Sequence, residues 1–88
     1  MADNSAAERS DLSVAVAAQI RAERAARGWT QAQVEQASGL PHSTYVRIES
    51  GSRVVNVSQL HRLARTFGIR PSVLIQRAYD RIDDKEQK

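Results

Sequence analysis

Hydrophobic residues recur at helical spacing along most of this chain, and no stretch alternates as a half-buried strand would. Leu12, Val16 and Ile20 fall four residues apart, with alanines between them. This spacing predicts a first helix that begins near Asp11 and ends at Gly28, because glycine adopts the left-handed conformation that closes helices.

A short second helix is expected over residues 31–38. Thr30 precedes it, and Gln33 stands three residues later, which is the spacing of a capping box. Gly39 follows the last residue of the stretch and permits a sharp reversal of the chain. The segment therefore predicts one helix and the turn that ends it.

A third helix is expected at about 41–50. Pro41 suits its first turn, because the N–H that proline lacks would have no helical partner there. Tyr45 and Ile48 share one face and can pack against the preceding helix. Two short helices joined by a tight turn with glycine are the sequence form of a helix-turn-helix.

Two more helices complete the pattern. Asn56 and Gln59 repeat the capping-box spacing before a fourth helix that is expected to end at Gly68. A fifth helix is expected to begin at Pro71. Its apolar residues are Leu74, Ile75, Ala78, Tyr79 and Ile82.

This pattern predicts an all-α fold of five helices in one domain. We expect that domain to cover residues 11–79, since a chain of 88 residues ordinarily forms a single domain. Residues 1–10 are polar and are expected to form a disordered lead. Residues 80–88 are charged and are expected to be the end of the fifth helix or a tail.

Composition narrows the functional classes. The chain has no cysteine, which excludes disulfides and thiolate zinc sites. No apolar run approaches the roughly 20 residues that a membrane-spanning helix needs, and the first ten residues are too polar for a signal peptide. We therefore expect a soluble cytoplasmic protein with no membrane partner. We also expect no enzyme, cofactor or metal site, because two isolated histidines and scattered carboxylates offer no catalytic group.

Charge is distributed unevenly along the chain. Residues 12–79 carry nine arginines against three acids, Glu23, Glu35 and Glu49, a net charge of +6 before histidine is counted. The remaining acids lie toward the two ends. A basic body is the electrostatic pattern expected of a protein that binds a polyanion such as DNA.

Several runs between Ile20 and Leu74 carry a resemblance to a known family. They are Arg24-x-x-x-Gly28-Trp29-Thr30-Gln31, then Val34, Gly39-Leu40, Ser43 to Gly51, and Leu63 to Ile69. With this spacing, about two thirds of the chain resembles the lambda-repressor-like helix-turn-helix family. That family includes phage repressors, Cro proteins and regulators of the xenobiotic-response-element type.

The resemblance implies a five-helix fold and a role for each matching position. The residues implied to face bases in the major groove are His42, Ser43, Val46 and Arg47. The residues implied to contact phosphates are Thr30, Gln31, Ser50 and Arg53. Arg24 and Glu49 match a family ion pair that orients the recognition helix.

The chemistry of the side chains agrees with these roles. Arginine fits guanine O6 and N7 in a two-pronged contact, so Arg47 is the first choice for a specificity residue. Val46 can pack on a thymine methyl group, and His42 can bond a base or a phosphate. Trp29 is expected to pack in the core and not to stack on a base.

Three positions depart from the family pattern. Glu35 stands where a small residue is usual, and we expect it either to turn toward the rim or to bond the hydroxyl of Tyr45. Pro41 replaces the usual Ser or Thr cap of the recognition helix. Arg70 is a poor cap ahead of the fifth helix.

The expected function is a sequence-specific transcriptional regulator that binds double-stranded DNA. A repressor that binds two half-sites as a homodimer is the leading interpretation. Apolar residues on the fifth helix, Ile75, Tyr79 and Ile82, are the candidate dimer interface. The candidate protein partner is a toxin or the transcription machinery. The alternative function is an antitoxin that represses its own operon and also binds a toxin.

Overall fold

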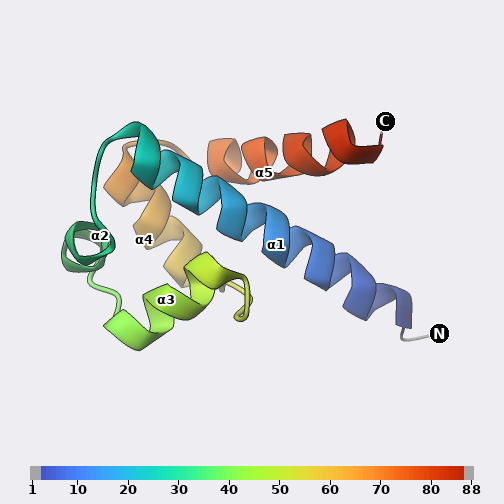
Figure 1. The fold of residues 1–88 in the computed structure, drawn as a ribbon, viewed down its shortest axis with the longest axis horizontal. Helices are drawn as coiled ribbons and strands as arrows, with labels where there is room; N and C mark the ends of the chain where they lie inside the picture. The colour runs from blue at the N-terminus through green and yellow to red at the C-terminus, as the bar shows by residue number, and fades with distance from the viewer. Residues whose placement is uncertain (1–2, 87–88) are drawn as a thin grey trace.

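The computed structural model describes the backbone of residues 3–86 and the side chains of residues 11–83. Over this range the chain forms five helices and no strand, so the all-α, five-helix prediction is confirmed (Figure 1). The helices are α1 (Asp3–Ala26), α2 (Gln31–Ser38), α3 (His42–Ser50), α4 (Val57–Phe67) and α5 (Pro71–Glu86). None of the helices found in that range is both long and apolar enough to cross a membrane.

The helices surround one core. The long α5 packs along α1, while α2, α3 and α4 gather on the other side of α1 (Figure 1). Ile20 of α1, Tyr45 and Ile48 of α3, Leu63 of α4 and Leu74 of α5 are completely or almost completely buried. Every helix except α2 thus contributes a large core residue here, and α2 contributes the buried Val34.

One predicted helix end, the start of the first helix, differs from the structure. The first helix begins at Asp3 and not near Asp11, so it extends into the segment expected to be a disordered lead. That segment contains neither glycine nor proline, and nothing in it ends a helix. Helix α5 begins at Pro71 as expected and continues to Glu86, through most of the charged end. The division of the chain into a lead, a domain and an end remains a prediction.

Capping boxes begin two of the short helices, as their spacing predicted. Thr30 Oγ1 accepts from the N–H of Gln33 at 3.1 Å, and Gln33 Oε1 accepts from the N–H of Thr30 at 2.7 Å. Asn56 and Gln59 make the same reciprocal pair before α4, at 2.7 and 3.0 Å. Both boxes satisfy N–H groups that a helix start otherwise leaves unbonded.

The turn between α2 and α3 depends on Gly39. Its φ is +76°, a left-handed conformation, and its N–H donates to the carbonyl of Glu35 at 2.9 Å. A Cβ at this position would lie 3.2 Å from Nη1 of Arg62, the flexible end of an exposed side chain, so the turn favours glycine by conformation. Pro41 then precedes α3 without any side-chain cap, and α3 begins at His42.

Candidate nucleic-acid interface

The two faces of α3 differ sharply in exposure. His42, Ser43 and Arg47 are exposed and Val46 is half-buried, whereas Tyr45, Ile48 and Glu49 are buried. The helical repeat produces this division, because residues three and four apart lie on one side of a helix. The four residues expected to contact bases therefore lie on the outer part of the helix, whose opposite face is buried in the domain.

The residues expected to contact phosphates lie at both sides of this helix. Thr30 is exposed at the start of α2, where unbonded N–H groups and the helix dipole favour an anion. Ser50 and Arg53 are exposed at the end of α3 and in the following loop. A shallow hollow at the start of α2 is lined by Thr30 and Gln31 and by three ionisable side chains, those of Arg24, Glu35 and His42, among others.

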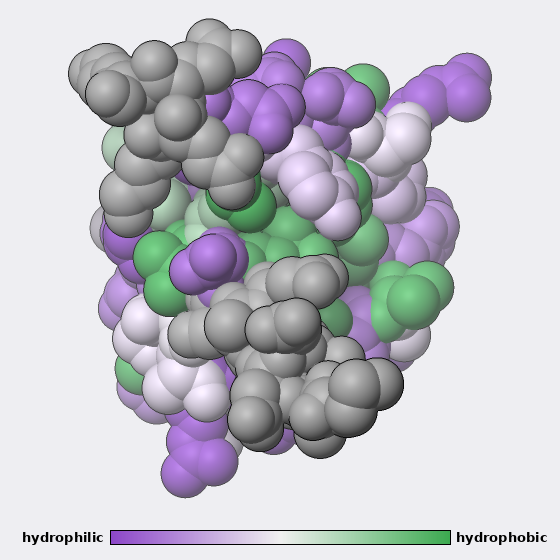
Figure 2. Space-filling model, turned by 90° about the vertical axis from the view of Figure 1, so that its right-hand side faces the viewer, coloured by the Kyte–Doolittle hydropathy of each residue, from purple (hydrophilic) through white to green (hydrophobic). Residues whose placement is uncertain are grey.

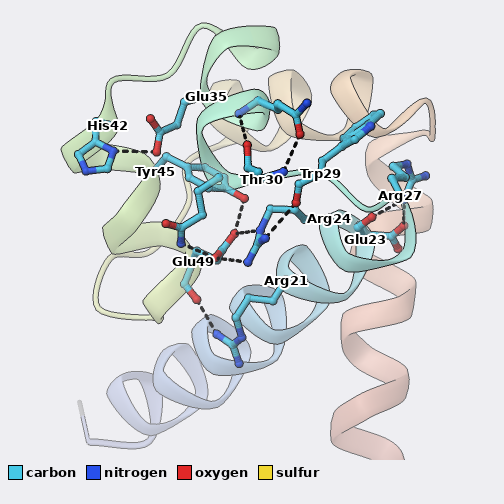
Figure 3. A network of polar contacts seen from close by, with 12 residues as sticks. Arg21, Glu23, Arg24, Arg27, Trp29, Thr30, Glu35, His42, Tyr45 and Glu49 are labelled. Carbon is cyan, nitrogen blue, oxygen red and sulfur yellow. Dashed lines mark hydrogen bonds and ion pairs between the residues drawn. The ribbon is translucent and has the colours of Figure 1, made fainter.

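Glu49 is the centre of a polar network that joins three helices (Figure 3). Its carboxylate, only 3 % exposed, accepts from Arg24 Nε at 2.9 Å and from Arg24 Nη2 at 3.1 Å. Gln31 Nε2 donates to the same carboxylate at 2.6 Å, and the hydroxyl of Tyr45 donates to its other oxygen. Arg21 Nη1 donates to the backbone carbonyl of Glu49 at 2.5 Å. The predicted pair of Arg24 and Glu49 is thus present as a two-pronged contact.

The electrostatics of this network favour the charged carboxylate. Burial alone would raise the pKa of Glu49, but hydrogen bonds from Arg24, Tyr45 and Gln31 outweigh burial and hold that pKa below its usual range. The hydrogen bond to Glu49 raises the pKa of Arg24. Burial and the same carboxylate raise the pKa of Tyr45, so its hydroxyl stays protonated and donates. The network orients α3 from α1 and α2 through charged hydrogen bonds.

The position of Gln31 changes the expectation for this residue. Its amide nitrogen is bonded to Glu49, whereas the resemblance implied that the amide contacts a phosphate. An amide nitrogen has two hydrogens, so one remains for a second acceptor. Sequence reasoning missed the link to Glu49, because it joins residues 18 positions apart.

Glu35 turns toward the rim of the site, which was one of the two expected positions. Its Oε2 lies 2.8 Å from Nδ1 of His42, the first residue of α3 (Figure 3). The alternative, a bond to the hydroxyl of Tyr45, is wrong, because that hydroxyl donates to Glu49. The departure from the family pattern is therefore a contact at the edge of the recognition helix.

A second buried carboxylate fixes α5 against α1. Glu23 accepts from Arg77 Nη1 of α5 at 2.7 Å, from Arg27 Nη1 at 2.9 Å and from Gln19 Nε2 at 2.7 Å. Burial would raise the pKa of Glu23, but these hydrogen bonds, that of Arg77 first, lower it overall. Sequence reasoning assigned Glu23 no role. The sequence did contain a signal, because Glu23 is one of only three acids in residues 12–79. In the structure each of the three lies against a basic side chain.

Trp29 packs inside the domain, as expected. Its ring stacks on Phe67 of α4 with ring centres 6.2 Å apart and an angle of 17° between the planes. The guanidinium of Arg27 lies over both rings, 5.8 Å from the centre of Trp29 and 5.1 Å from that of Phe67. The tryptophan thus packs against α4 and the turn that follows α1, and it is not free to stack on a base.

The candidate interface on α5 is largely used within the domain. Ile75 and Ile82 pack against the core, and only Tyr79 is exposed, at 45 %. The apolar side chains with a greater exposed fraction lie elsewhere: Val57 is 83 % exposed, Val14 55 % and Val54 54 %. Val54 and Val57 border an apolar groove that Leu12, Val16, Leu60 and Ile75 also line.

Acidic and histidine side chains do not gather into a metal site. Among the residues whose side chains are described, no group of three or more His, Asp or Glu residues could hold an ion. The two histidines lie on different helices, His42 on α3 and His61 on α4.

A comparison with known families gives one result. A family model described as helix-turn-helix matches residues 20–74, which is more than half of the chain. The match begins in α1, contains α2, α3 and α4, and ends within α5. Neither the curated proteins nor the solved structures contain a match to this chain.

Proposed function

The chain belongs to the helix-turn-helix family of DNA-binding transcriptional regulators, of the lambda-repressor-like type, and from this premise we propose that it is a sequence-specific repressor that binds double-stranded DNA as a dimer. One observation carries the proposal. The outer part of α3 presents His42, Ser43, Val46 and Arg47, while a network around Glu49 holds its inner face.

The recognition helix α3 enters the major groove and contacts base edges. Arg47 is exposed on the second turn and bonds O6 and N7 of a guanine with its guanidinium fork. Val46 packs on a thymine methyl group, and the hydroxyl of Ser43 can donate to an acceptor or accept from a donor on a base edge. These contacts supply specificity, while contacts to the backbone set the position of the helix.

Phosphates are bound at both sides of α3. At one side, the first turn of α2 offers free N–H groups beside Thr30, and Gln31, which lines the same hollow, has a second amide hydrogen for a phosphate. At the other side, Ser50 and Arg53 are exposed near the end of α3. The net positive charge of residues 12–79 adds attraction that does not depend on sequence.

Exposed apolar surface supports a dimer. Hydrophobic side chains gather on the side of the molecule where the free ends of α1 and α5 lie (Figure 2). Val57 and Val54 project beside the apolar groove, so the chain offers both a projecting and a hollow apolar surface. A self-complementary surface of this kind is what a two-fold contact needs. Tyr79 is the one residue of the α5 candidate that remains exposed.

Dimerisation would match two half-sites about one helical turn apart. A dimer bound across a promoter excludes the polymerase, which is the simplest form of repression. Such a regulator acts in the cytoplasm of a cell, where it meets its operator. In the antitoxin alternative the DNA interface is the same and the apolar groove holds a toxin, so a stable homodimer through Val57 argues against it.

Selection of bound duplexes from random DNA tests the proposal. We expect one enriched half-site, repeated with two-fold symmetry, and binding that weakens steeply as salt rises, because phosphate contacts release counterions. Arg47→Ala should enrich a more degenerate half-site, with Arg65→Ala on α4 as a matched control. Enrichment of no sequence by the unaltered protein would contradict sequence-specific binding.

A further inference from the structure

Glu35 and His42 form a pair at the start of the recognition helix. Glu35 projects from α2 and is only 14 % exposed, whereas His42 is 75 % exposed at the first position of α3. Nδ1 of the imidazole lies 2.8 Å from Oε2 of the carboxylate. Figure 3 shows the ring with this nitrogen turned toward Glu35, so the other ring nitrogen, Nε2, is directed elsewhere.

The contact determines where the imidazole proton lies. An ionised carboxylate only accepts hydrogen bonds, so Nδ1 must hold a hydrogen to bond it at this distance. A neutral imidazole has one N–H, and with that hydrogen on Nδ1 the free Nε2 is an acceptor. When the ring is charged both nitrogens are donors. Glu35 therefore fixes the chemical character of the exposed nitrogen.

The surroundings leave Glu35 as the partner of the ring. Besides these two residues, the hollow between α2 and the start of α3 is lined by one other charged side chain, Arg24 of α1. Arg24 is engaged by Glu49 at 2.9 Å and by the carbonyl of Trp29 at 3.1 Å. Within the described side chains, the hydrogen-bond partner of His42 is Glu35.

We propose that Glu35 is a positioning residue for DNA recognition that makes Nε2 of neutral His42 an acceptor directed at a base. This proposal rests on the proposed function, in which α3 enters the major groove. Only two groups donate in that groove, the amino groups of cytosine N4 and adenine N6. Neutral His42 therefore prefers cytosine or adenine and disfavours guanine and thymine, which present acceptors at the corresponding edge.

Protonation reverses this preference. Charged His42 donates from Nε2, which suits guanine O6 or N7, thymine O4 or a phosphate oxygen. Histidine is the residue type that changes charge between about pH 5 and 8. The base selected opposite His42 therefore depends on pH, while the contacts of Arg47 do not.

The tautomer is tested first, without DNA. Nitrogen-15 chemical shifts at pH 8 should show the hydrogen of His42 on Nδ1, and in Glu35→Ala it should move to Nε2, which a free imidazole favours. His61, exposed on α4, is an internal reference, and Gln36→Ala on α2 is the matched control. If His42 and His61 show the same tautomer balance in the unaltered protein, the proposal is overturned.

The base preference is tested by selecting duplexes at about pH 8 and at about pH 5.5. At pH 8 we expect roughly tenfold enrichment of cytosine or adenine at one position of the half-site. That enrichment should be lost at pH 5.5, in Glu35→Ala and in His42→Ala, and kept in Gln36→Ala. The same base at both pH values and in Glu35→Ala would overturn the proposal.

The two tests separate this inference from the function on which it rests. If neither the unaltered protein nor Gln36→Ala enriches a sequence, the proposed function fails, whatever the tautomer is. If a half-site is enriched but no position responds to pH or to Glu35→Ala, the function stands and the role of Glu35 fails. Thermal unfolding of each variant shows that the comparison is made between folded proteins.

Discussion

The side-chain amide of Gln31 donates to the carboxylate of Glu49 at 2.6 Å, so the first residue of α2 is bonded to the next-to-last residue of α3. This bond connects the proposed phosphate contact with the orientation of the recognition helix. A change at Gln31 therefore acts on the fold and on DNA binding together.

Gln31→Ala should weaken binding to random duplexes as well as to the operator, because a phosphate contact does not distinguish sequences. The variant should also lose about 1.5 kcal/mol of unfolding free energy, since a hydrogen bond to a buried charge is removed. Titrations on both duplexes and urea unfolding measure the two effects. A loss confined to the operator would contradict the phosphate role.

Arg47→Ala should cost about 1–3 kcal/mol of binding to the operator and little on random DNA, because a two-pronged contact to guanine is lost. Its exposed position predicts almost no change in stability. Arg65→Ala removes the same side chain from the exposed surface of α4 and serves as the control. Equal weakening on both duplexes would show that Arg47 contacts only phosphates.

Arg24→Ala should lower the unfolding free energy by about 3 kcal/mol, because it leaves the buried carboxylate of Glu49 without its main partner. Urea unfolding measures the loss, and Arg62→Ala at an exposed position is the comparison. The double variant Arg24→Met/Glu49→Leu should recover part of the stability, since no buried charge is left unpaired. If the loss of unfolding free energy in the double variant equals the sum of the losses in Arg24→Met and Glu49→Leu measured singly, the two residues do not interact.

Stability should fall in acid. The pKa values of Glu23 and Glu49 are lowered in the folded protein, so each carboxylate contributes stability above its unfolded pKa of about 4.3. That contribution decreases below this pH and is gone once the pH passes below the folded pKa. Urea midpoints between about pH 3 and 7 should therefore form a plateau and then decline. Glu23→Gln should make the decline shallower, whereas Asp83→Asn on the exposed surface of α5 should not.

Val57→Asp should dissociate the proposed dimer. Val57 is 83 % exposed at the first position of α4, and an acid there interacts favourably with the helix dipole, so the monomer should stay folded. Sedimentation at micromolar concentration measures the association. Ser58→Asp adds the same charge to the next, exposed residue and is the control. A dimer that persists in Val57→Asp would place the interface elsewhere.

The helices and turns of the fold could be predicted from patterns among residues close together in the sequence. Capping boxes at Thr30 and Asn56, the turn at Gly39 and the apolar spacing of α1 depend on residues within one or two helical turns, so their patterns were visible. The start of α1 was not, because the extension to Asp3 shows no apolar period.

The contacts of the site were harder to predict from the sequence. The resemblance implied the pair of Arg24 and Glu49, but the contacts of Gln31 and Arg21 with Glu49 join three helices whose relative angles the sequence pattern leaves open. The role of Glu35 depended on the same angles. Both positions expected for its carboxylate, at the rim or beside the hydroxyl of Tyr45, were compatible with the sequence, and the packing of α3 directs that hydroxyl to Glu49.

The division of α3 into an exposed and a locked face has an evolutionary consequence. Exchanging the exposed residues for those of another regulator would alter the operator without disturbing the scaffold, because the bonds of Glu49 lie on the opposite side. In this chain the set of residues to exchange includes one outside α3, namely Glu35 of α2. A transplant that takes His42 without Glu35 would carry the side chain but leave behind the residue that fixes its hydrogen.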